Sequence, residues 1–179
     1  MPYPEHVGTE RLALRRPRER DRGAWLGVWG DPAVWRPIAP GARPDPARAL
    51  ARFDHHLRHW DEHGFGLWAL VPREGDAGCI GFAGLAIPSF LPAILPAVEV
   101  GWRLAPDWWG RGLGTEAARA SVAFGFDELA LRSIVSVIDE RNERSLRLAA
   151  RLGMRRGADR LHPVTRRRLR VMRLERPAD

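Results

Sequence analysis

Apolar and polar residues alternate most clearly in a segment just past the middle of the chain. Val98, Val100 and Trp102 alternate with Glu99 and Arg103, which is the period of a β-strand with one buried face. The pattern therefore predicts a central strand with the apolar side chains on one face and the charged side chains on the other.

The hydrophobic period changes from two to that of a helix directly after this strand. The apolar residues at helical spacing are Leu113, Ala117, Ala120 and Phe124. Between the strand and this helix, glycine stands at every second position, Gly110, Gly112 and Gly114, where the backbone must approach a neighbour closely or adopt a positive φ. Free N–H groups at such a helix start, together with the positive end of the helix dipole, favour binding of a phosphate or pyrophosphate.

The same periodicities and turn signals predict the other elements. In the first half we expect a strand at 10–15, helices at 18–30, 31–35 and 47–63, and a hairpin of strands at 65–71 and 78–87. In the second half we expect a strand at 133–138, a helix at 143–152, and strands at 154–158 and 166–174. Periodicity alone thus predicts one mixed α/β domain over residues 1–179.

Two proline-rich segments interrupt this order. Residues 88–96 are apolar and lie in a loop, which indicates a lid, a wall of a substrate site or a homodimer contact. Trp35 and the loop at 37–44 are expected to face a substrate.

Composition points to a cytoplasmic protein. The hydrophobic fraction is 45%, and no apolar run approaches the roughly 20 residues that span a bilayer. Residues 1–22 are charged and lack the apolar centre of a signal peptide. The single cysteine, Cys79, excludes an internal disulfide and fits a reducing compartment. We therefore expect no membrane association.

The net charge of +7 first suggests nucleic-acid binding. However, all 29 basic residues are arginine, lysine and glutamine are absent, and the charge is spread along the chain. This composition is typical of a GC-rich genome rather than of a binding face, and it argues against nucleic acid as the partner. Arginine's planar fork still suits phosphate groups on a smaller anionic ligand.

The glycine turn fits neither of two common phosphate-binding motifs. A P-loop requires lysine, and a dinucleotide fingerprint requires G-x-G-x-x-G in the first βα turn. The stretch instead resembles the acetyl-CoA loop of the GNAT acetyltransferase superfamily, Q/R-x-x-G-x-G/A, with Gly112 and Gly114 at the fourth and sixth positions. Trp109 departs from the Gln or Arg of the first position, and Arg111 is a nearby guanidinium that could replace it.

The order of elements resembles the GNAT plan along nearly the whole chain. The resemblance implies a twisted mixed sheet of about seven strands, splayed at the centre, with flanking helices. The variant Trp-Gly-x-Gly-x-Gly-Thr-Glu-Ala is most similar to the branch of ribosomal-protein N-terminal (alanine/serine) acetyltransferases.

This branch implies direct transfer of an acetyl group from acetyl-CoA, a co-substrate, to a primary amine in a ternary complex. The expected acceptor is a protein N-terminal α-amine. A small amine such as an antibiotic or polyamine is the alternative, although the first half of the chain has no acidic run to attract a polycation. A non-catalytic CoA-binding regulatory module is a further alternative.

The resemblance also implies which residues bind the cofactor. Backbone groups at the end of the central strand would hold the pantetheine arm, the glycine turn would hold the pyrophosphate, and an Asn-x-x-Ser segment would contact the pantetheine. The implied cofactor-binding residues are Trp102, Arg103, Leu104, Trp109, Gly110, Arg111, Gly112, Leu113, Gly114, Thr115, Asn142 and Ser145. The alternative for the glycine turn is an ordinary helix start capped by Thr115 or Asp107.

Glu99 and Ser145 are the candidate catalytic residues. Burial beside apolar neighbours could raise the pKa of Glu99, so that it acts as a general base through a water. The alternative is an ordinary outward-facing carboxylate. In the family, Ser or Tyr near the sulfur can protonate the thiolate. Here Ala149 occupies the tyrosine position and Tyr3 is the only tyrosine, so Ser145 or a water must serve.

Asn142 and the histidines have competing interpretations. Asn142 is the only asparagine, which favours a functional role, although Asn142 or Asp139 could simply cap a helix. His55, His59 and His63 have the i, i+4 spacing of a helical metal clamp. No H-E-x-x-H motif supports a metal site, so we expect no metal. We expect instead that this helix borders the acceptor cleft and that its histidines titrate near neutral pH.

Overall fold

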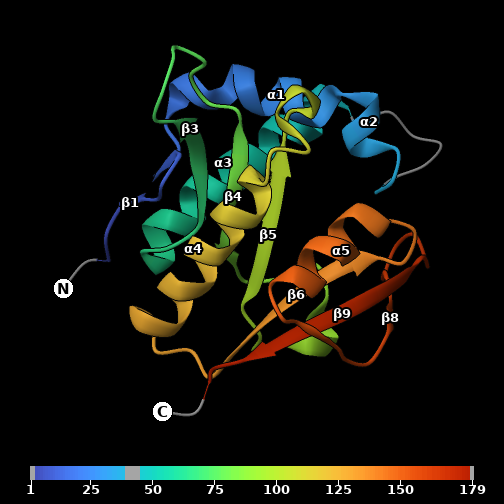
Figure 1. Cartoon of the computed structure of the whole chain (residues 1–179). Helices are drawn as coiled ribbons and strands as arrows, with labels where there is room; N and C mark the ends of the chain where they lie inside the picture. Colours follow the sequence, from blue (N-terminus) through green and yellow to red (C-terminus); the bar gives the residue numbers. More distant parts are fainter. Residues whose placement is uncertain (1–2, 39–44, 178–179) are drawn as a thin grey trace.

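A mixed β-sheet runs through the molecule in the computed structural model, which describes residues 3–38 and 45–177 (Figure 1). Within these ranges the sheet has nine strands in the order β1-β2-β3-β4-β5-β6-β9-β7, and β8 pairs with β9. The strands are β1 His6–Gly8, β2 Leu12–Arg15, β3 Leu67–Pro72, β4 Gly81–Ala86, β5 Glu99–Leu104, β6 Ser133–Asp139, β7 Arg155–Arg156, β8 Arg160–Leu161 and β9 Arg168–Glu175.

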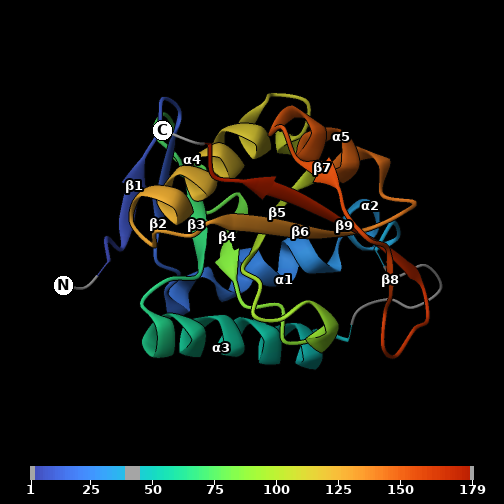
Figure 2. The ribbon, with the colours of Figure 1, turned by 90° about the horizontal axis from the view of Figure 1, so that it is seen from below.

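Helices cover both faces of this sheet. The helices are α1 Arg22–Gly30, α2 Pro32–Trp35, α3 Pro46–His63, α4 Leu113–Asp127 and α5 Glu143–Arg151. Seen from below, α1 and α3 lie on one face, whereas α4 and α5 lie on the other (Figure 2). None of the helices in the described ranges is long and apolar enough to cross a membrane.

Apolar side chains fill the space on each side of the sheet. Between α4 and the sheet, Trp68, Leu85, Val100 and Ala117 have no exposed surface. A second cluster, under α1 and α3, consists of Trp25, Ala49, Phe53, Ala69 and Phe82. Burial of this apolar area, which contributes about 25 cal/mol per Å², fixes the helices against the strands that carry the site.

The helix boundaries follow the signals in the sequence. The carboxylate of Asp31 accepts a hydrogen bond from Ala33 N at 2.8 Å, so it caps α2 as expected. Gly64 ends α3 with a φ of 72°, the left-handed conformation that favours glycine. The predicted helix at 18–30 begins later, at Arg22, because Asp21 accepts from Arg18 N and pairs with Arg15 at 2.8 Å.

The short strands differ from the prediction. The strand expected at 10–15 is present as β2, and the strand expected at 154–158 is the two-residue β7. β1 and β8 were not predicted. The sheet therefore has nine strands rather than about seven. Two or three residues are too few for an alternating pattern to emerge, because such strands pair only through backbone contacts with a neighbour.

The sheet opens between β5 and β6, which are parallel. Only one residue pair joins them in the described structure, Glu99 opposite Val135, and Val135 N donates to Val98 O at 2.9 Å. Beyond this pair the strands diverge, as the upright β5 and the oblique β6 show in Figure 1. The predicted central splay is therefore confirmed.

One glycine, Gly84, allows β3 and β4 to lie close together next to this opening. Gly84 on β4 is opposite Leu67 on β3 and Gly101 on β5. A Cβ atom on Gly84 would lie 2.3 Å from Gly66 O and 2.7 Å from the Leu67 Cα. Glycine is therefore required at position 84 by the proximity of neighbouring backbone.

The apolar segment at 88–96 contacts the far end of the sheet. It contains a 3₁₀ turn at Pro92–Ile94, and the exposed Phe90 ring stacks on His162, with 6.0 Å between the ring centroids. His162 lies in the connection between β8 and β9. The segment thus joins two parts of the structure that are distant in sequence.

Candidate functional site

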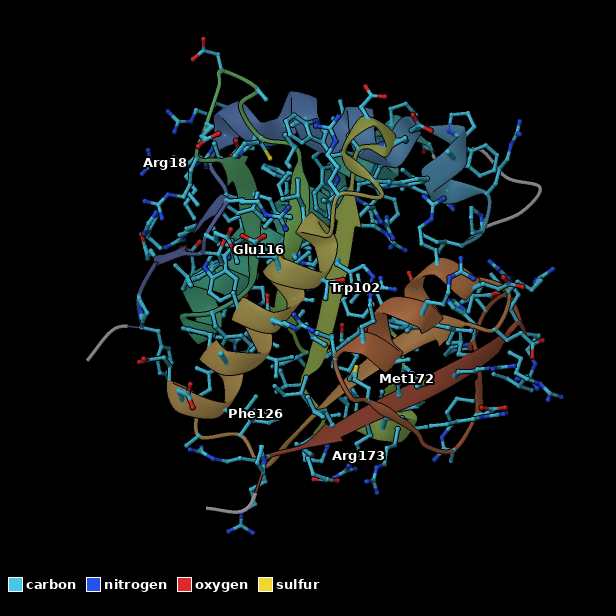
Figure 3. All side chains as sticks on the ribbon, in the orientation of Figure 1. Arg18, Trp102, Glu116, Phe126, Met172 and Arg173 are labelled. Atoms are coloured by element: carbon cyan, nitrogen blue, oxygen red, sulfur yellow. The ribbon has the colours of Figure 1, made fainter. Side chains whose placement is uncertain are left out.

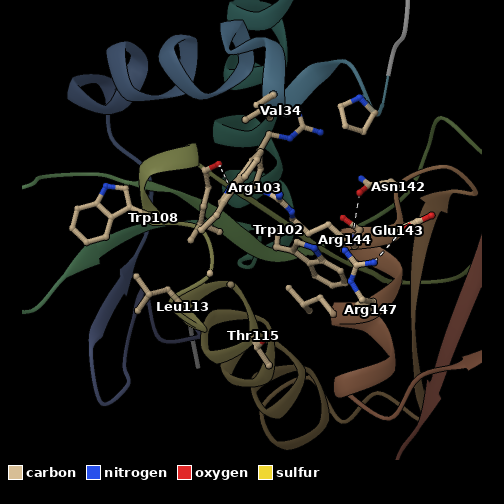
Figure 4. Close-up of a pocket in the computed structure, with 18 of the residues that line it drawn as sticks. Val34, Trp102, Arg103, Trp108, Leu113, Thr115, Asn142, Glu143, Arg144 and Arg147 are labelled. Carbon is tan, nitrogen blue, oxygen red and sulfur yellow. Dashed lines mark hydrogen bonds and ion pairs between the residues drawn. The ribbon is translucent and has the colours of Figure 1, made fainter.

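A cavity of about 730 Å³ lies where the two halves of the sheet diverge, a size typical of ligand clefts. Its walls come from α2 and the residues after it, the end of β5, the glycine turn with the start of α4, and the start of α5 (Figure 4). In Figure 3, Trp102 lies between β5 and α5. The predicted site residues that line the cavity are Trp102, Arg103, Leu104, Trp109, Gly110, Gly112, Leu113, Gly114, Thr115, Asn142 and Ser145. Glu99 and Arg111 are outside this lining.

The start of α4 has the geometry of an anion site. Gly110 and Gly112 have φ values of 75° and 80°, and Gly112 is the N-cap residue. Within the described chain no side chain caps this helix. Thr115 Oγ1 instead accepts from Arg151 Nε at 3.4 Å. Thr115 N and Glu116 N donate to Gly112 O, so the amides of Leu113 and Gly114 are the ones that remain available to an anion in the cavity. The capping alternative for Thr115 and Asp107 is wrong.

An arginine-rich wall faces this helix start. Four arginines line the cavity from the turn before α5 and along the length of that helix: Arg141, Arg144, Arg147 and Arg151. Their positive charge and planar donors suit phosphate groups, so the cavity fits the pyrophosphate and phosphate of CoA. These residues were not predicted from the sequence, although the spacing of Arg144, Arg147 and Arg151 by three and four positions places them on one face of a helix.

Trp109, which departs from the family motif, has a defined role in the structure. Its indole N–H donates to Leu104 O at 2.9 Å, and the centroid of its ring lies 3.8 Å from the guanidinium carbon of Arg144. The glycine turn is thereby tied to β5, and Arg144 brings a guanidinium to this position. Arg111 lies outside the cavity lining, with its guanidinium carbon 4.9 Å from the centroid of the Trp108 ring.

Asn142 caps a helix and also lines the cavity. Its side-chain oxygen accepts from Ser145 N at 3.2 Å, the N-cap hydrogen bond of α5. The capping role that we considered for it is therefore present in the geometry. Asp139 has a different role, because it pairs with Arg167 at 2.7 Å and accepts from Arg141 N at 3.0 Å. The amide nitrogen of Asn142 remains a possible donor to a ligand.

Glu99 occupies the opening between β5 and β6. Its Oε1 accepts from Val137 N at 3.1 Å, so the carboxylate bridges the strands just beyond their single backbone pairing. Burial raises the pKa of Glu99 to about 7, although the Val137 N–H and the charge of Arg103 oppose the shift. The outward-facing interpretation of this carboxylate is therefore wrong, and a group with this pKa can accept a proton near neutral pH.

Two histidines of α3, His56 and His59, are held in neutral forms. His59 is hydrogen-bonded through both ring nitrogens, with Nδ1 donating to Phe65 O at 2.8 Å and Nε2 accepting from Ile87 N at 3.1 Å. Burial lowers the pKa of His56 to about 3 and also lowers that of His59. The expectation that this helix titrates near neutral pH is wrong for these two residues. Among the described residues, no group of His, Cys, Asp or Glu is placed to hold a metal.

The region expected to face the acceptor is described in part. Ala33 and Val34 of α2, followed by Pro37 and Ile38, line the cavity next to Arg103. Residues 39–44 of the predicted loop lie outside the described residues.

Comparisons with known proteins agree with this geometry. The sequence model of the Acetyltransferase (GNAT) domain matches residues 11–155. A crystal structure of the acetyltransferase from Agrobacterium tumefaciens str. C58 has a TM-score of 0.79 at 29% identity, covering 96% of this chain and 94% of that one.

Two further similar proteins have names that include an acceptor. Spermidine N(1)-acetyltransferase from Escherichia coli (strain K12) is 29% identical over 101 residues, which are 56% of this chain and 50% of the relative. The ribosomal-protein-S5-alanine acetyltransferase from Vibrio fischeri has a TM-score of 0.72 at 16% identity, covering 95% of this chain and 96% of that one. The second likeness is one of fold alone.

Proposed function

The chain belongs to the GNAT acetyltransferase family, and from this premise we propose that it transfers an acetyl group from acetyl-CoA to the α-amine of a protein N-terminus. The protein is an acyltransferase. The observation that carries the proposal is the position of Glu99, a carboxylate with a pKa of about 7 at the opening of the sheet, on the strand that also lines the cavity. The single cysteine of the chain supports a cytoplasmic location.

The cavity lining suggests how acetyl-CoA is held. The amides at the start of α4 would bind the pyrophosphate, and the arginines of α5 would bind the phosphates. Backbone groups of Trp102, Arg103 and Leu104 and the amide of Asn142 would hold the pantetheine arm. Acetyl-CoA, when bound, supplies the acetyl group as an activated thioester.

The residues of the chain then serve proton transfer and alignment. Glu99 would accept a proton from the acceptor ammonium through a water, which frees the nitrogen lone pair for attack on the thioester carbonyl carbon. As the C–N bond forms and the C–S bond breaks, the second nitrogen proton passes to the sulfur through the Ser145 hydroxyl or a water. Holding both reactants in line removes the entropic cost of a bimolecular encounter.

A protein N-terminus is the acceptor supported by the Trp-Gly-x-Gly-x-Gly-Thr-Glu-Ala motif, through its resemblance to the ribosomal-protein branch. A small amine is the second candidate, because a relative that shares part of the chain is named for spermidine. These two classes are distinguished by assay.

Thermal melting and thiol release together test the proposal. Acetyl-CoA at a large excess over its Kd should raise the Tm by several degrees, because it binds only the folded protein. With acetyl-CoA present, free thiol should appear with N-terminal peptides and more slowly with small amines. Absence of stabilisation would refute the cofactor assignment. Stabilisation with turnover of small amines alone would refute the peptide acceptor.

The two roles of Asn142 can be separated by two substitutions. Asn142→Ala removes the cap of α5 and should destabilise the protein by about 1 kcal/mol, measured by denaturant unfolding. Asn142→Ser retains a capping oxygen and should preserve stability, yet it removes the amide donor and should raise the KM for acetyl-CoA. If Asn142→Ser leaves that KM unchanged, the residue is a cap only.

A further inference from the structure

Two arginines lie against the same tryptophan beside the catalytic opening. The Arg103 guanidinium is 3.3 Å from the centroid of the Trp29 ring, and the Arg52 guanidinium is 5.1 Å from it. Arg103 comes from β5, Arg52 from α3 and Trp29 from α1. Arg103 is half-buried and lines the cavity, whereas Arg52 is exposed and lies outside the lining.

Neither arginine has an acidic partner among residues 3–38 and 45–177. The ion pairs of this part of the chain include neither side chain, and Arg103 Nη1 is buried without a hydrogen-bond partner. The segment 39–44 contains no Asp or Glu in its sequence. A buried polar atom without a partner is costly. Burial, together with the charge of Arg52, lowers the pKa of Arg103 to about 9, although the charge of Glu99 opposes this shift. Within the described residues, Arg103 is therefore a cation that could take an anion from a bound ligand.

The position of Arg103 shows which reactant could supply this anion. Side chains alternate along β5, so Arg103 and Glu99 point to the face covered by α1 and α3, whereas Leu104 packs toward Leu113 on the α4 side. The proposed phosphate site is at the start of α4 and on α5. Arg103 is thus on the side of the proposed base, next to the part of the cavity lined by Val34 and Pro37.

Other groups on this side are also basic. Arg167 donates to Pro37 O at 3.0 Å, and its ion pair with Asp139 neutralises its charge. The pKa of His162 is lowered by burial and by the charges of Arg52 and Arg167. Among these groups, Arg103 and Arg52 are the cations that remain without a carboxylate.

We propose that the acceptor is an amine that also carries a carboxylate, and that Arg103 and Arg52 bind this carboxylate over the face of Trp29. The inference rests on the proposed acetyl transfer and defines its acceptor class. The planar forks of arginine form paired hydrogen bonds with a carboxylate, and Glu99 on the same strand face receives the ammonium. The carboxylate belongs either to an acidic side chain near a peptide N-terminus or to a free amino acid.

The same arrangement disfavours polyamines as acceptors. A polycation such as spermidine would place a second ammonium near Arg103 and Arg52, where like charges repel. The relative named for spermidine therefore does not define the acceptor of this chain.

Matched acceptor pairs test the proposal at saturating acetyl-CoA. The peptides Ala-Glu-Ala-amide and Ala-Gln-Ala-amide differ only in a side-chain carboxylate, and alanine and alaninamide differ only in the α-carboxylate. We expect kcat/KM to be roughly 10- to 100-fold higher for the acidic member of one pair, the range of a charge-assisted hydrogen bond. The pair that responds identifies the source of the carboxylate. Equal rates within both pairs, or a preference for spermidine, would overturn the proposal.

Substitutions assign the preference to the two arginines. Arg103→Met and Arg52→Met should each reduce it by raising the KM of the acidic acceptor, and Arg103→Lys should restore part of it. Arg58→Met, an exposed residue on α3 without an ion pair in the described structure, is the control and should retain the preference. A preference that survives in both methionine variants would overturn the proposal, as would a raised KM for acetyl-CoA in Arg103→Met.

Binding of the acceptor can be measured without turnover. In calorimetric titrations of the CoA-saturated protein, Ala-Glu-Ala-amide should bind at least 10-fold more tightly than Ala-Gln-Ala-amide, and Arg103→Met should remove the difference. Tighter binding of the acidic peptide supports the carboxylate site even if no peptide is acetylated. The absence of acetylation would refute only the proposed function. Equal binding within this peptide pair and also within the pair of alanine and alaninamide would refute the carboxylate site.

Discussion

Replacing Glu99 with glutamine should lower kcat by about 100-fold or more, within the range that a general base contributes. Glutamine retains an oxygen that can accept from Val137 N, so the bridge between β5 and β6 should persist and the KM for acetyl-CoA should stay within about twofold. Thiol release at saturating peptide and acetyl-CoA measures the effect. Glu128→Gln, an exposed residue at the end of α4, is the control.

The pH dependence distinguishes a base from a structural carboxylate. Because the pKa of Glu99 is about 7, kcat/KM should fall about tenfold per unit as the pH drops below 7. The same acceptor with Glu99→Gln should lack the part of this slope that Glu99 causes. If the variant keeps full activity or the same profile, Glu99 is a structural bridge and a water chain removes the proton.

Ionisation of Glu99, which should increase activity, should also lower the stability of the folded protein. Burial raises the pKa of Glu99 from 4.5 to about 7 in the folded protein, so the folded state binds this proton more tightly than the unfolded state. Ionisation of Glu99 therefore costs stability as the pH rises from about 4.5 to 7. Denaturant unfolding should show this loss in the wild type and less of it in Glu99→Gln.

The second large effect is expected at Gly84. Substitution by alanine would place a Cβ atom 2.3 Å from Gly66 O, and backbone cannot swing away as a flexible side chain can. The strands β3 and β4 must then separate, so we expect a loss of about 3 kcal/mol in the free energy of unfolding. For a chain of this size the Tm should fall by about 6–12 °C.

Gly101 provides the matched control, because it is the cross-strand partner of Gly84 on β5. A Cβ atom at Gly101 would have no heavy atom within 4 Å. Gly101→Ala should therefore change stability by no more than about 0.5 kcal/mol. If both variants lose the same stability, the cost reflects a general intolerance of alanine in this part of the sheet rather than the close approach of β3.

The parts of the site that are continuous in sequence could be predicted from it. The strand containing Glu99, the glycine turn and the start of α4 form one stretch, and their period and glycine spacing define the cavity wall that they form. The cap at Asp31 and the end of α3 at Gly64 follow from local chemistry for the same reason. Local patterns are sufficient where local hydrogen bonds and φ angles determine the structure.

The contacts that define the chemistry depend on residues far apart in sequence. Glu99 accepts a hydrogen bond from Val137 N, 38 positions away in the sequence. Alternation along β5 alone therefore could not distinguish a buried carboxylate from an outward-facing one. The contacts of Trp29 with Arg52 and Arg103 require α1, α3 and β5 to assemble. The arginines of α5 have a helical spacing, but only the fold shows that this helical face lines the cavity.

The divergence of β5 from β6 gives the sheet an edge in its interior. An exposed edge on the outside of a protein can pair with the strand of another chain and promote aggregation. Here α2 lies on one side of the opening and α5 on the other, so this edge is enclosed by the molecule's own elements. The protein can thus keep backbone groups free for a slender ligand while denying them to a neighbouring sheet.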